Sequence, residues 1–339
     1  MRTTLLLLLS LCPLAAQTDP AVLTRLLGQY KPSPAAFSFA AIGDQQYGAE
    51  GIAKWPALAA SINASASQLQ FVVHAGDIKS GSTLCDDAMY ANRLAAFNAL
   101  ELPMILTPGD NEWTDCHRAN NGSYDSIERL AYLRGVFFNG EESLGKRRMP
   151  VFRQSEDPRY RLYRENAIWT HGNIVFASLH IVGSNNNLGR NAANDAEYTA
   201  RNLANLDWIH TAFSLARDGG FAGVVLLMQA NPSFPRVADG PSLVPEAGFV
   251  DSIYALEAET IAFGKPVLMI HGDSHFFRID KPLPSRKNGR ALENFTRLEV
   301  PGSTDVHWVR VHVNPAKPLT LFSYEHEDVE ANFVKHPLP

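Results

Sequence analysis

Short apolar runs alternate with segments of helical spacing along the first third of the chain. The runs at 37–42, 71–74 and 104–106 have the length and composition of buried strands in a parallel sheet. Between them, apolar residues recur every three or four positions at 52–67 and 86–100, which predicts two helices. Strands that alternate with helices in this way are typical of right-handed βαβ units.

The same alternation continues beyond a less regular segment at 117–165. It predicts, in chain order, a strand at 173–182, a helix at 195–215, strands at 224–228 and 267–270, and alternating strands at 306–313 and 319–324. The last two suit antiparallel strands of a second sheet. Since no long linker interrupts the pattern, we expect one domain at 37–326, after an approach segment at 17–36 with a short helix at 21–27, and before a tail at 327–339.

Four of the predicted strands end in a Gly-Asp pair. The pairs are Gly43-Asp44, Gly76-Asp77, Gly109-Asp110 and Gly272-Asp273. Gly-Asp is also an ordinary turn pair, so a single copy would carry little weight. In an open α/β sheet, however, ligands bind at the carboxyl ends of the strands. Four such pairs at strand ends therefore indicate a functional site.

Four carboxylates at one sheet edge would repel each other strongly. The repulsion is tolerable if some stay protonated, if they splay into water, or if cations lie among them. Two divalent ions would balance four carboxylates, and a carboxylate that bridges ions roughly 3.5–4 Å apart is the usual two-metal geometry. Charge balance therefore favours a site for two divalent metal ions.

The series of motifs resembles the calcineurin-like metallophosphoesterases over about residues 37–313. The motifs are Gly43-Asp44-x-Gln46, Gly76-Asp77, Gly109-Asp110-Asn111-Glu112, Gln229 and Gly272-Asp273-x-His275. The resemblance implies an α/β fold, a four-layer αββα sandwich of two mixed sheets flanked by helices. It also implies hydrolysis of a phosphate mono- or diester by a metal-bound hydroxide.

The family's ligands carry over only in part. The matching residues are Asp44, Asp77 (the bridging ligand), Glu112 and His275, whereas Gln46, Gln229 and Asp273 stand where the family has His, and Asp110 where it has Asn. Decay of an abandoned site would leave apolar residues about as often as polar ones. Every replaced ligand position instead keeps an oxygen, and oxygen ligands suit Mg, Mn or Ca better than Zn or Fe. The expected metal ligands are thus Asp44, Gln46, Asp77, Asp110, Gln229, Asp273 and His275.

Asn111 stands where the family uses a His to contact the scissile phosphate and protonate the leaving group. An amide can donate a hydrogen bond but cannot act as a general acid, which could cost on the order of 10²–10⁴-fold on a poor leaving group. Either another group donates the proton, with His307 or His117 as candidates, or the substrate has a good leaving group. Packing of His307 beside Trp308 is the structural alternative.

Two basic residues follow the motif loops closely enough to contact a phosphate. Lys79 and Arg118 are the candidates for substrate binding, with surface ion pairs as the alternative. The 339 residues are 45% hydrophobic and 19% charged, with a formal net charge of −5. This slight acidity argues against nucleic acid as the main partner and leaves a small phosphate ester as the expected substrate.

Residues 1–16 have the pattern of a signal peptide: Arg2, an apolar run at 5–11, and small residues at the cleavage point. The run is too short to span a bilayer, so no transmembrane segment is expected in the mature chain. Cys12 suggests lipid anchoring, but the bulky Leu11 before it makes a secreted or periplasmic protein the favoured interpretation.

Removal of the signal peptide would leave Cys85 and Cys116 as the cysteines of the mature chain. Each follows one of the Gly-Asp motifs, on loops that should be neighbours. In an exported protein this even number favours a disulfide over two free thiols.

The sequence therefore predicts an exported, metal-dependent phosphoesterase. The alternative is a non-catalytic, metal-stabilised binding or structural domain of the cell envelope (a pseudoenzyme), which the missing general acid and lost histidine ligands would fit. A serine or cysteine hydrolase has little support, because the chain contains no Gly-x-Ser-x-Gly motif.

Overall fold

The computed structural model describes residues 18–234 and 247–333. The predicted signal peptide (1–16), with Cys12, lies outside the described residues. The helices are α1 (Pro20–Gln29), α2 (Gly48–Ala64), α3 (Asp87–Asn98), α4 (Ser126–Phe137), α5 (Gly183–Asn186), α6 (Ala192–Asp218) and α7 (Val250–Phe263). The strands are β1 (Phe37–Ile42), β2 (Val72–His74), β3 (Met104–Leu106), β4 (Phe152–Arg153), β5 (Ala167–His171), β6 (Ile174–Ser178), β7 (Gly223–Leu227), β8 (Val267–His271), β9 (Arg278–Asp280), β10 (Phe295–Glu299), β11 (Trp308–Val313) and β12 (Phe322–Glu327).

The strands form two mixed sheets. The five-stranded sheet has the order β12-β11-β1-β2-β3, in which β1, β2 and β3 are parallel and β11 and β12 are antiparallel additions. The seven-stranded sheet has the order β4-β5-β6-β7-β8-β10-β9, with β6, β7, β8 and β10 parallel. The prediction that the C-terminal strands belong to a second sheet is wrong, because β11 pairs with β1 and extends the first sheet.

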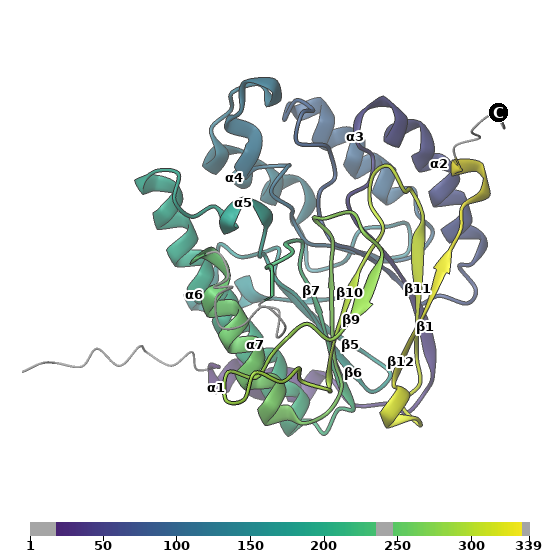
Figure 1. Cartoon of the computed structure of the whole chain (residues 1–339), viewed down its shortest axis with the longest axis vertical. Helices are drawn as coiled ribbons and strands as arrows, with labels where there is room; N and C mark the ends of the chain where they lie inside the picture. The colour runs from purple at the N-terminus through teal and green to yellow at the C-terminus, as the bar shows by residue number, and fades with distance from the viewer. Residues whose placement is uncertain (1–17, 235–246, 334–339) are drawn as a thin grey trace, which may run out of the picture.

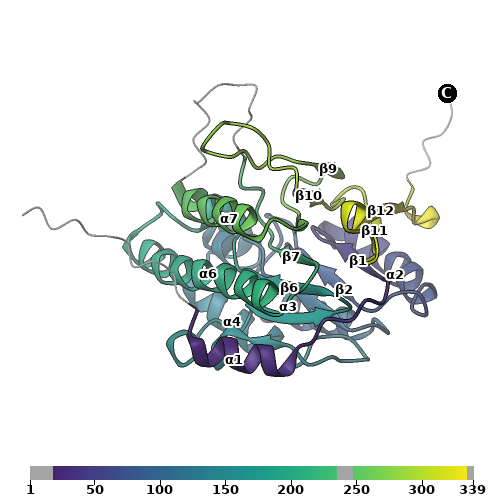
Figure 2. The ribbon, with the colours of Figure 1, turned by 90° about the horizontal axis from the view of Figure 1, so that it is seen from below.

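Helices cover the outer faces of the stacked sheets (Figure 1). In Figure 2, α6 and α7 lie on one side of the strands and α2 lies on the opposite side. Three buried apolar clusters fill the three interfaces: between α1, α6, α7 and the seven-stranded sheet, between the two sheets, and between the five-stranded sheet and α2, α3, α4. The predicted four-layer αββα sandwich is therefore confirmed.

The alternation of side chains along β1 divides them between two of these interfaces. Phe37, Phe39 and Ala41 face the other sheet, whereas Ala40 and Ile42 face the helices. Both faces of the strand are buried, so the segment reads as a continuous apolar run. Polar residues begin directly after Ile42, where the strand leaves the core.

The predicted strands and crossover helices appear within a few residues of their expected positions, and the 37–42 and 104–106 strands match to the residue. The helix expected at 21–27 is α1. Helices α4 and α7 were not predicted from the sequence. No helix in the described ranges is long and apolar enough to cross a membrane.

Candidate functional site

The loops at the carboxyl ends of both sheets bring the four aspartates together. Asp44, Asp77 and Asp110 follow β1, β2 and β3 of one sheet, and Asp273 follows β8 of the other. Carboxylate oxygens of Asp77, Asp110 and Asp273 lie within 4.8 Å of one another. The Asp44 carboxylate accepts hydrogen bonds from the backbone N–H of Asp273, at 3.0 and 3.1 Å. The cluster therefore bridges the edges of two sheets rather than lying at one.

The glycines of these motifs leave room for carboxylates from other strands. A Cβ on Gly109 would overlap the Asp77 carboxylate, and a Cβ on Gly272 would overlap that of Asp44. Two of the four Gly-Asp pairs thus combine an acid with the space that a neighbouring acid needs.

Five residues of the site have positive backbone φ, a region that non-glycine residues rarely adopt. They are Asp44, Gln46, Asp77, Asp273 and His275, with φ between 53° and 79°. Such conformations cost on the order of 1–3 kcal/mol each and cluster at functional sites. The chain therefore holds strained backbone where the motif residues meet.

Burial and mutual repulsion make the acids of the cluster weak. Burial, followed by the charges of Asp110, Glu112, Asp44 and Asp273, raises the pKa of Asp77 well above its ordinary value. Burial and the Asp110 charge raise the pKa of Asp273 to about 7, and burial raises the pKa of Glu112 to about 7. These carboxyl groups therefore retain protons near neutral pH unless a cation replaces them.

Two side chains have donor atoms suited to such a cation. The His275 Nδ1–H donates to the Ser303 carbonyl at 2.7 Å, which directs Nε2 toward Asp44, 3.5 Å from Oδ1. A hydrogen bond from the second ring nitrogen to a carbonyl is common in metal-ligating histidines. The Gln46 Oε1 is buried and has no hydrogen-bond partner among the described residues. Together with the acids, these atoms fit a divalent cation.

Gln229 is oriented differently from the prediction that its oxygen ligates metal. Its Oε1 accepts from the backbone N–H of Gly183 at 2.7 Å, while Nε2 lies 3.3 Å from oxygens of both Asp110 and Asp273. A backbone N–H can only donate, so this contact fixes which end of the amide faces the acids. In this arrangement Gln229 donates to the acids instead of offering a ligand oxygen.

Asn111 lies directly against Asp77. Its Nδ2 donates to Asp77 Oδ2 and to the Tyr47 hydroxyl, both at 2.8 Å, and the hydroxyl lies 2.8 Å from the same Asp77 oxygen. Burial and the charges of Asp77 and Asp44 raise the pKa of Tyr47, which keeps the hydroxyl protonated. Sequence reasoning missed Tyr47, although it follows Asp44 by three residues in the same motif loop.

His307 does not face the cluster, and the prediction of a catalytic role is corrected. Its Nδ1 accepts from the backbone N–H of Val329 at 2.9 Å, its Nε2 lies 3.1 Å from Asp305, and its ring packs against Phe333. The other candidate, His117, is exposed, and its Nδ1 bonds to the Thr114 carbonyl.

Lys79 is buried, which opposes its predicted contact with substrate. Its ammonium group donates to Asn121 Oδ1 at 2.6 Å and to the Ser80 carbonyl at 3.0 Å. Burial lowers the pKa of Lys79 to about 8. The side chain is therefore used to hold the loop beneath the site.

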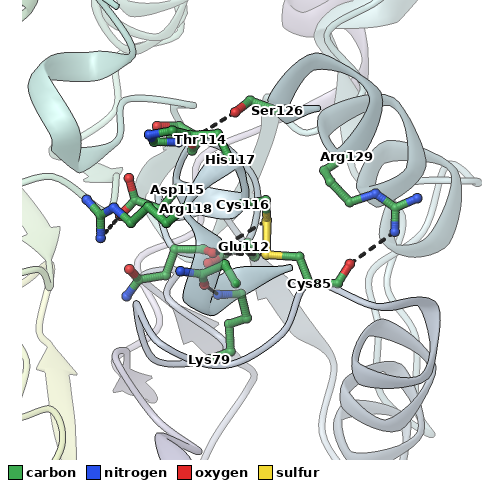
Figure 3. Close-up of a disulfide and its surroundings, with 12 residues drawn as sticks. Lys79, Cys85, Glu112, Thr114, Asp115, Cys116, His117, Arg118, Ser126 and Arg129 are labelled. Carbon is green, nitrogen blue, oxygen red and sulfur yellow. Dashed lines mark hydrogen bonds and ion pairs between the residues drawn. A yellow bond between two sulfur atoms is a disulfide. The ribbon is translucent and has the colours of Figure 1, made fainter. Parts of the chain in front are cut away.

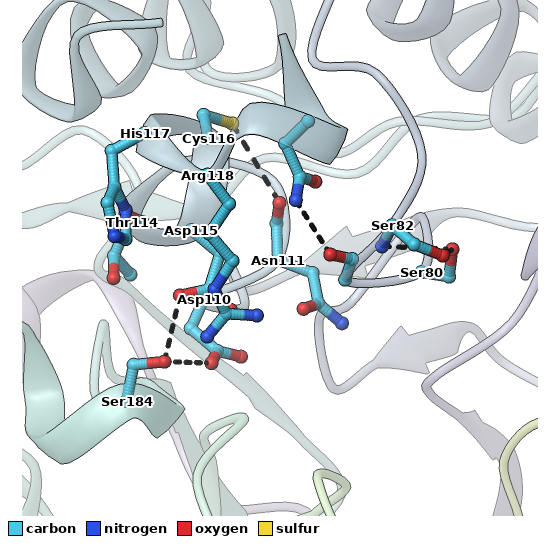
Figure 4. Close-up of polar contacts among 12 residues, drawn as sticks. Ser80, Ser82, Asp110, Asn111, Thr114, Asp115, Cys116, His117, Arg118 and Ser184 are labelled. Atoms are coloured by element: carbon cyan, nitrogen blue, oxygen red, sulfur yellow. Dashed lines mark hydrogen bonds and ion pairs between the residues drawn. The ribbon is translucent and has the colours of Figure 1, made fainter. Parts of the chain in front are cut away.

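Arg118 is half exposed and lies beside Asn111 (Figure 4). Its Nη1 is 2.8 Å from the buried Asp115 carboxylate, and both Arg118 and Asn111 lie against the open side of Gly81. Asp115 belongs to a short 3₁₀ helix, η1 (Thr114–His117), directly after the Asp110 motif. The guanidinium is thus anchored at one end and open to solvent at the rim of the cluster.

Asp110 is also held from the opposite side by α5. The Ser184 hydroxyl lies 2.7 Å from Asp110 Oδ2 and 3.0 Å from Asp115 Oδ1 (Figure 4). Residues 184–187 all have positive φ (51°, 52°, 54° and 69°), a left-handed turn that the Asn run at 185–187 tolerates. Sequence reasoning missed Ser184 and Asp115.

The predicted disulfide is confirmed. Cys85 and Cys116 are bonded (Figure 3), with Cα atoms 5.8 Å apart. Both sulfur atoms lie 3.8 Å from the Asn111 carbonyl oxygen. The bridge joins the loop after β2 to the loop after β3 immediately behind Asn111. It therefore fixes two of the motif loops to each other.

No family model matches the chain. A search of curated proteins finds no match. Among solved structures, the chain is similar to PhoD, with a TM-score of 0.54 and 14% identity over 84% of this chain and 65% of that one. It is also similar to purple acid phosphatase PPD1 isolated from yellow lupin (Lupinus luteus) seeds, with a TM-score of 0.52 and 12% identity over 90% of this chain and 53% of that one.

The chain spans between about half and two thirds of the length of these two structures. At 12–14% identity the likeness is one of fold. The two mixed sheets with flanking helices therefore form the fold that this chain shares with PhoD and with a purple acid phosphatase.

Proposed function

We propose that this chain is a metal-dependent phosphoesterase of the calcineurin-like kind, acting on a small phosphate mono- or diester. The observation that carries the proposal is the convergence of Asp77, Asp110 and Asp273, from two sheets, within 4.8 Å. Charged carboxylates this close repel each other and destabilise the folded chain, so a bound cation explains why they converge. The fold shared with PhoD and with a purple acid phosphatase supports the same conclusion.

The cations would be held by a set of side chains rich in oxygen atoms. The proposed ligands are Asp44, Gln46, Asp77, Asp110, Asp273 and His275. Five of these six are oxygen donors, so Mg, Mn or Ca is favoured over Zn or Fe, and two ions would balance the four aspartates. Divalent ions there would polarise a phosphoryl oxygen and make water a better nucleophile.

The chain's own residues would position the substrate. Arg118, anchored by Asp115, would bind phosphoryl oxygens at the rim, because a guanidinium offers paired donors to such oxygens. Asn111, whose Nδ2 donates to Asp77 and to Tyr47, would hold these two groups in place beside the phosphoryl group. Neither group has to transfer a proton in this role.

The proposal extends to where the protein works. The Cys85–Cys116 disulfide supports an oxidising compartment, consistent with a secreted or periplasmic protein. We further propose that residues 37–326 form the catalytic domain.

The test is elemental analysis combined with hydrolysis of an aryl phosphate monoester and diester in the presence of Mg, Mn, Ca or Zn. Metal-loaded wild type should turn over at least one ester. Asp77→Asn should reduce the rate by at least about 10³-fold, since it removes the central charge. Asp218→Asn, at the exposed end of α6, serves as the matched control and should leave the rate unchanged. Full activity in Asp77→Asn would refute the assignment.

The orientation of Gln229 favours the alternative, a metal-stabilised domain without turnover, because its oxygen is taken by Gly183. The same experiment decides between the two. Bound metal without hydrolysis of any ester would support the non-catalytic domain.

A further inference from the structure

The leaving-group side of the proposed reaction lacks the family's histidine, and the inference below rests on the proposed phosphoesterase function. Asn111 occupies that position and can donate a hydrogen bond but not transfer a proton. A second donor, Tyr47, stands next to it. The question is what this pair of neutral donors does to a departing oxygen.

The two side chains form a closed set of hydrogen bonds with Asp77. Asn111 Nδ2 uses one hydrogen for Asp77 Oδ2 and one for Tyr47 Oη, and the Tyr47 hydroxyl donates to Asp77 Oδ2, all at 2.8 Å. The hydroxyl also lies 3.5 Å from Asp44 Oδ1. Tyr47 is thus aimed at the centre of the acid cluster, with its orientation set by Asn111.

Tyr47 is also the accessible member of this set. Asp77 and Asn111 are only 2% and 9% exposed, whereas Tyr47 is partly exposed. Its ring packs edge-on against His275, with centroids 5.1 Å apart, so the side chain spans the loops of the two sheets. Part of the Tyr47 side chain can therefore be reached from solvent, next to the acids.

The other donors considered for this role are engaged elsewhere in the described structure. His307 is bonded to Val329 and packs against Phe333, His117 is bonded to Thr114, and Lys79 is bonded to Asn121. Tyr47 and Asn111 therefore remain as the donors beside Asp77.

We propose that the Tyr47 hydroxyl, held by Asn111, turns its hydrogen from Asp77 Oδ2 to the leaving-group oxygen, and that the site accordingly takes esters whose leaving group departs as a stable anion. In the step, a water oxygen bonds to phosphorus while the bond from phosphorus to the leaving oxygen breaks. The electron pair stays on that oxygen, which leaves as an anion hydrogen-bonded to Tyr47. The attacking water gives up one proton to solvent, and the departed anion takes one proton from solvent. Phenolate is the model of this class.

A neutral donor near a developing negative charge stabilises it, because the hydrogen bond strengthens as the charge grows. It stabilises a basic alkoxide less than full proton transfer would. The rate should therefore depend steeply on how acidic the leaving group is.

The experiment compares the metal-loaded wild type, Tyr47→Phe and Asn111→His on phosphate esters of nitrophenol, phenol and an alkyl alcohol. Wild type should cleave the nitrophenyl ester far faster than the alkyl ester. Tyr47→Phe should lose roughly 10–100-fold, with the greater loss on the more basic leaving groups. Asn111→His should raise the rate of hydrolysis of the alkyl ester by about 10²-fold or more, since it adds a proton donor.

Binding of inorganic phosphate, measured by calorimetry, gives a readout that does not depend on turnover. Tyr47→Phe should bind phosphate several-fold more weakly, with the same metal content by elemental analysis. Tyr254→Phe, on the outer helix α7, is the matched control and should behave as wild type.

Two results would overturn the proposal. If the wild type is active and Tyr47→Phe shows the same dependence of rate on the leaving group, this inference fails while the proposed function stands. A metal-loaded wild type that cleaves none of the esters removes the proposed function, and this inference with it.

Discussion

Gly109 and Gly272 explain why glycine precedes aspartate in this site. Each glycine lies where a carboxylate from a different strand, Asp77 or Asp44, occupies the space of a Cβ. The packing of acids against backbone therefore depends on single missing methyl groups. Substitution at these positions should affect metal binding more strongly than it affects the stability of the fold.

We predict that Gly272→Ala lowers divalent metal affinity by at least about 10-fold, because the new methyl group displaces Asp44. Overpacking of this kind typically costs about 1–3 kcal/mol of stability. Gly135→Ala is the matched control: it lies in α4 with no atom within 4 Å of the added Cβ, and should stabilise by about 0.5–1 kcal/mol. Calorimetric metal titration and thermal melts measure both effects. Wild-type affinity in Gly272→Ala would contradict the packing argument.

The identity of the site residues could be predicted from the sequence, but the direction of their side chains could not. Position after a buried strand locates Asp44, Asp77 and Asp110 at a common edge, because they follow parallel strands of one sheet, whereas Asp273 follows a strand of the other sheet. The amide of Gln229 could face either way until the backbone N–H of Gly183 was placed beside it. Lys79 and His307 were likewise candidates from the sequence for contact with substrate, but the structure bonds them to Asn121 and Val329.

At the scale of elements, periodicity located strands and crossover helices but not their pairing. An alternating run such as β11 indicates a strand, and nothing in that run states which sheet it joins. Helix α4 was missed because its segment is rich in charge, and Arg129 of its buried face pairs with Asp87 and Glu128. The left-handed conformation of residues 184–187 leaves no repeating pattern in the sequence.

The disulfide makes a prediction about two motif loops. Cys85 and Cys116 are 31 residues apart, and loss of such a loop closure should cost about 3–4 kcal/mol. The double variant Cys85→Ala/Cys116→Ala should also weaken metal binding, because the bridge lies against the Asn111 carbonyl. Denaturant unfolding gives the first quantity and metal titration the second. A double variant that loses stability but binds metal as wild type would show that the bridge does not position the site.

At the scale of the whole molecule, the two sheets are joined by a core of apolar side chains and, at one end, by a cluster of acids. Phe39, Phe176 and Leu268 belong to that core. The core favours close approach of the sheets, and the acids oppose it when they are charged. The balance between these two forces should therefore depend on pH and on cations.

Buried histidines set the lower limit of the pH range in which this balance can be measured. Burial lowers the pKa of His74 and His271 to about 3 and that of His180 to about 4. Below about pH 6.5 the unfolded chain binds protons at these sites that the folded chain does not, so acid destabilises the fold. Above that pH these histidines are neutral in both states.

The acid cluster changes the stability of the fold with pH in the opposite direction. The pKa of Asp273 and that of Glu112 are about 7 in the folded chain, above their unfolded values, so the folded state holds protons that the unfolded state has released. Stability from these groups is present at low pH and is lost as pH rises through about 7. A bound cation would remove the loss by replacing the protons.

The most direct measurement is the free energy of unfolding between about pH 6.5 and pH 8.5, with chelator and with added Mg, Mn or Ca. In chelator, the titration of Asp273 and Glu112 should lower stability by about 1–2 kcal/mol over this range, and by less in Asp273→Asn. With the cation it should stay level and exceed the chelator value most at the higher pH. Equal stability with chelator and with every cation, at both ends of the range, would contradict the claim that cations hold these acids together.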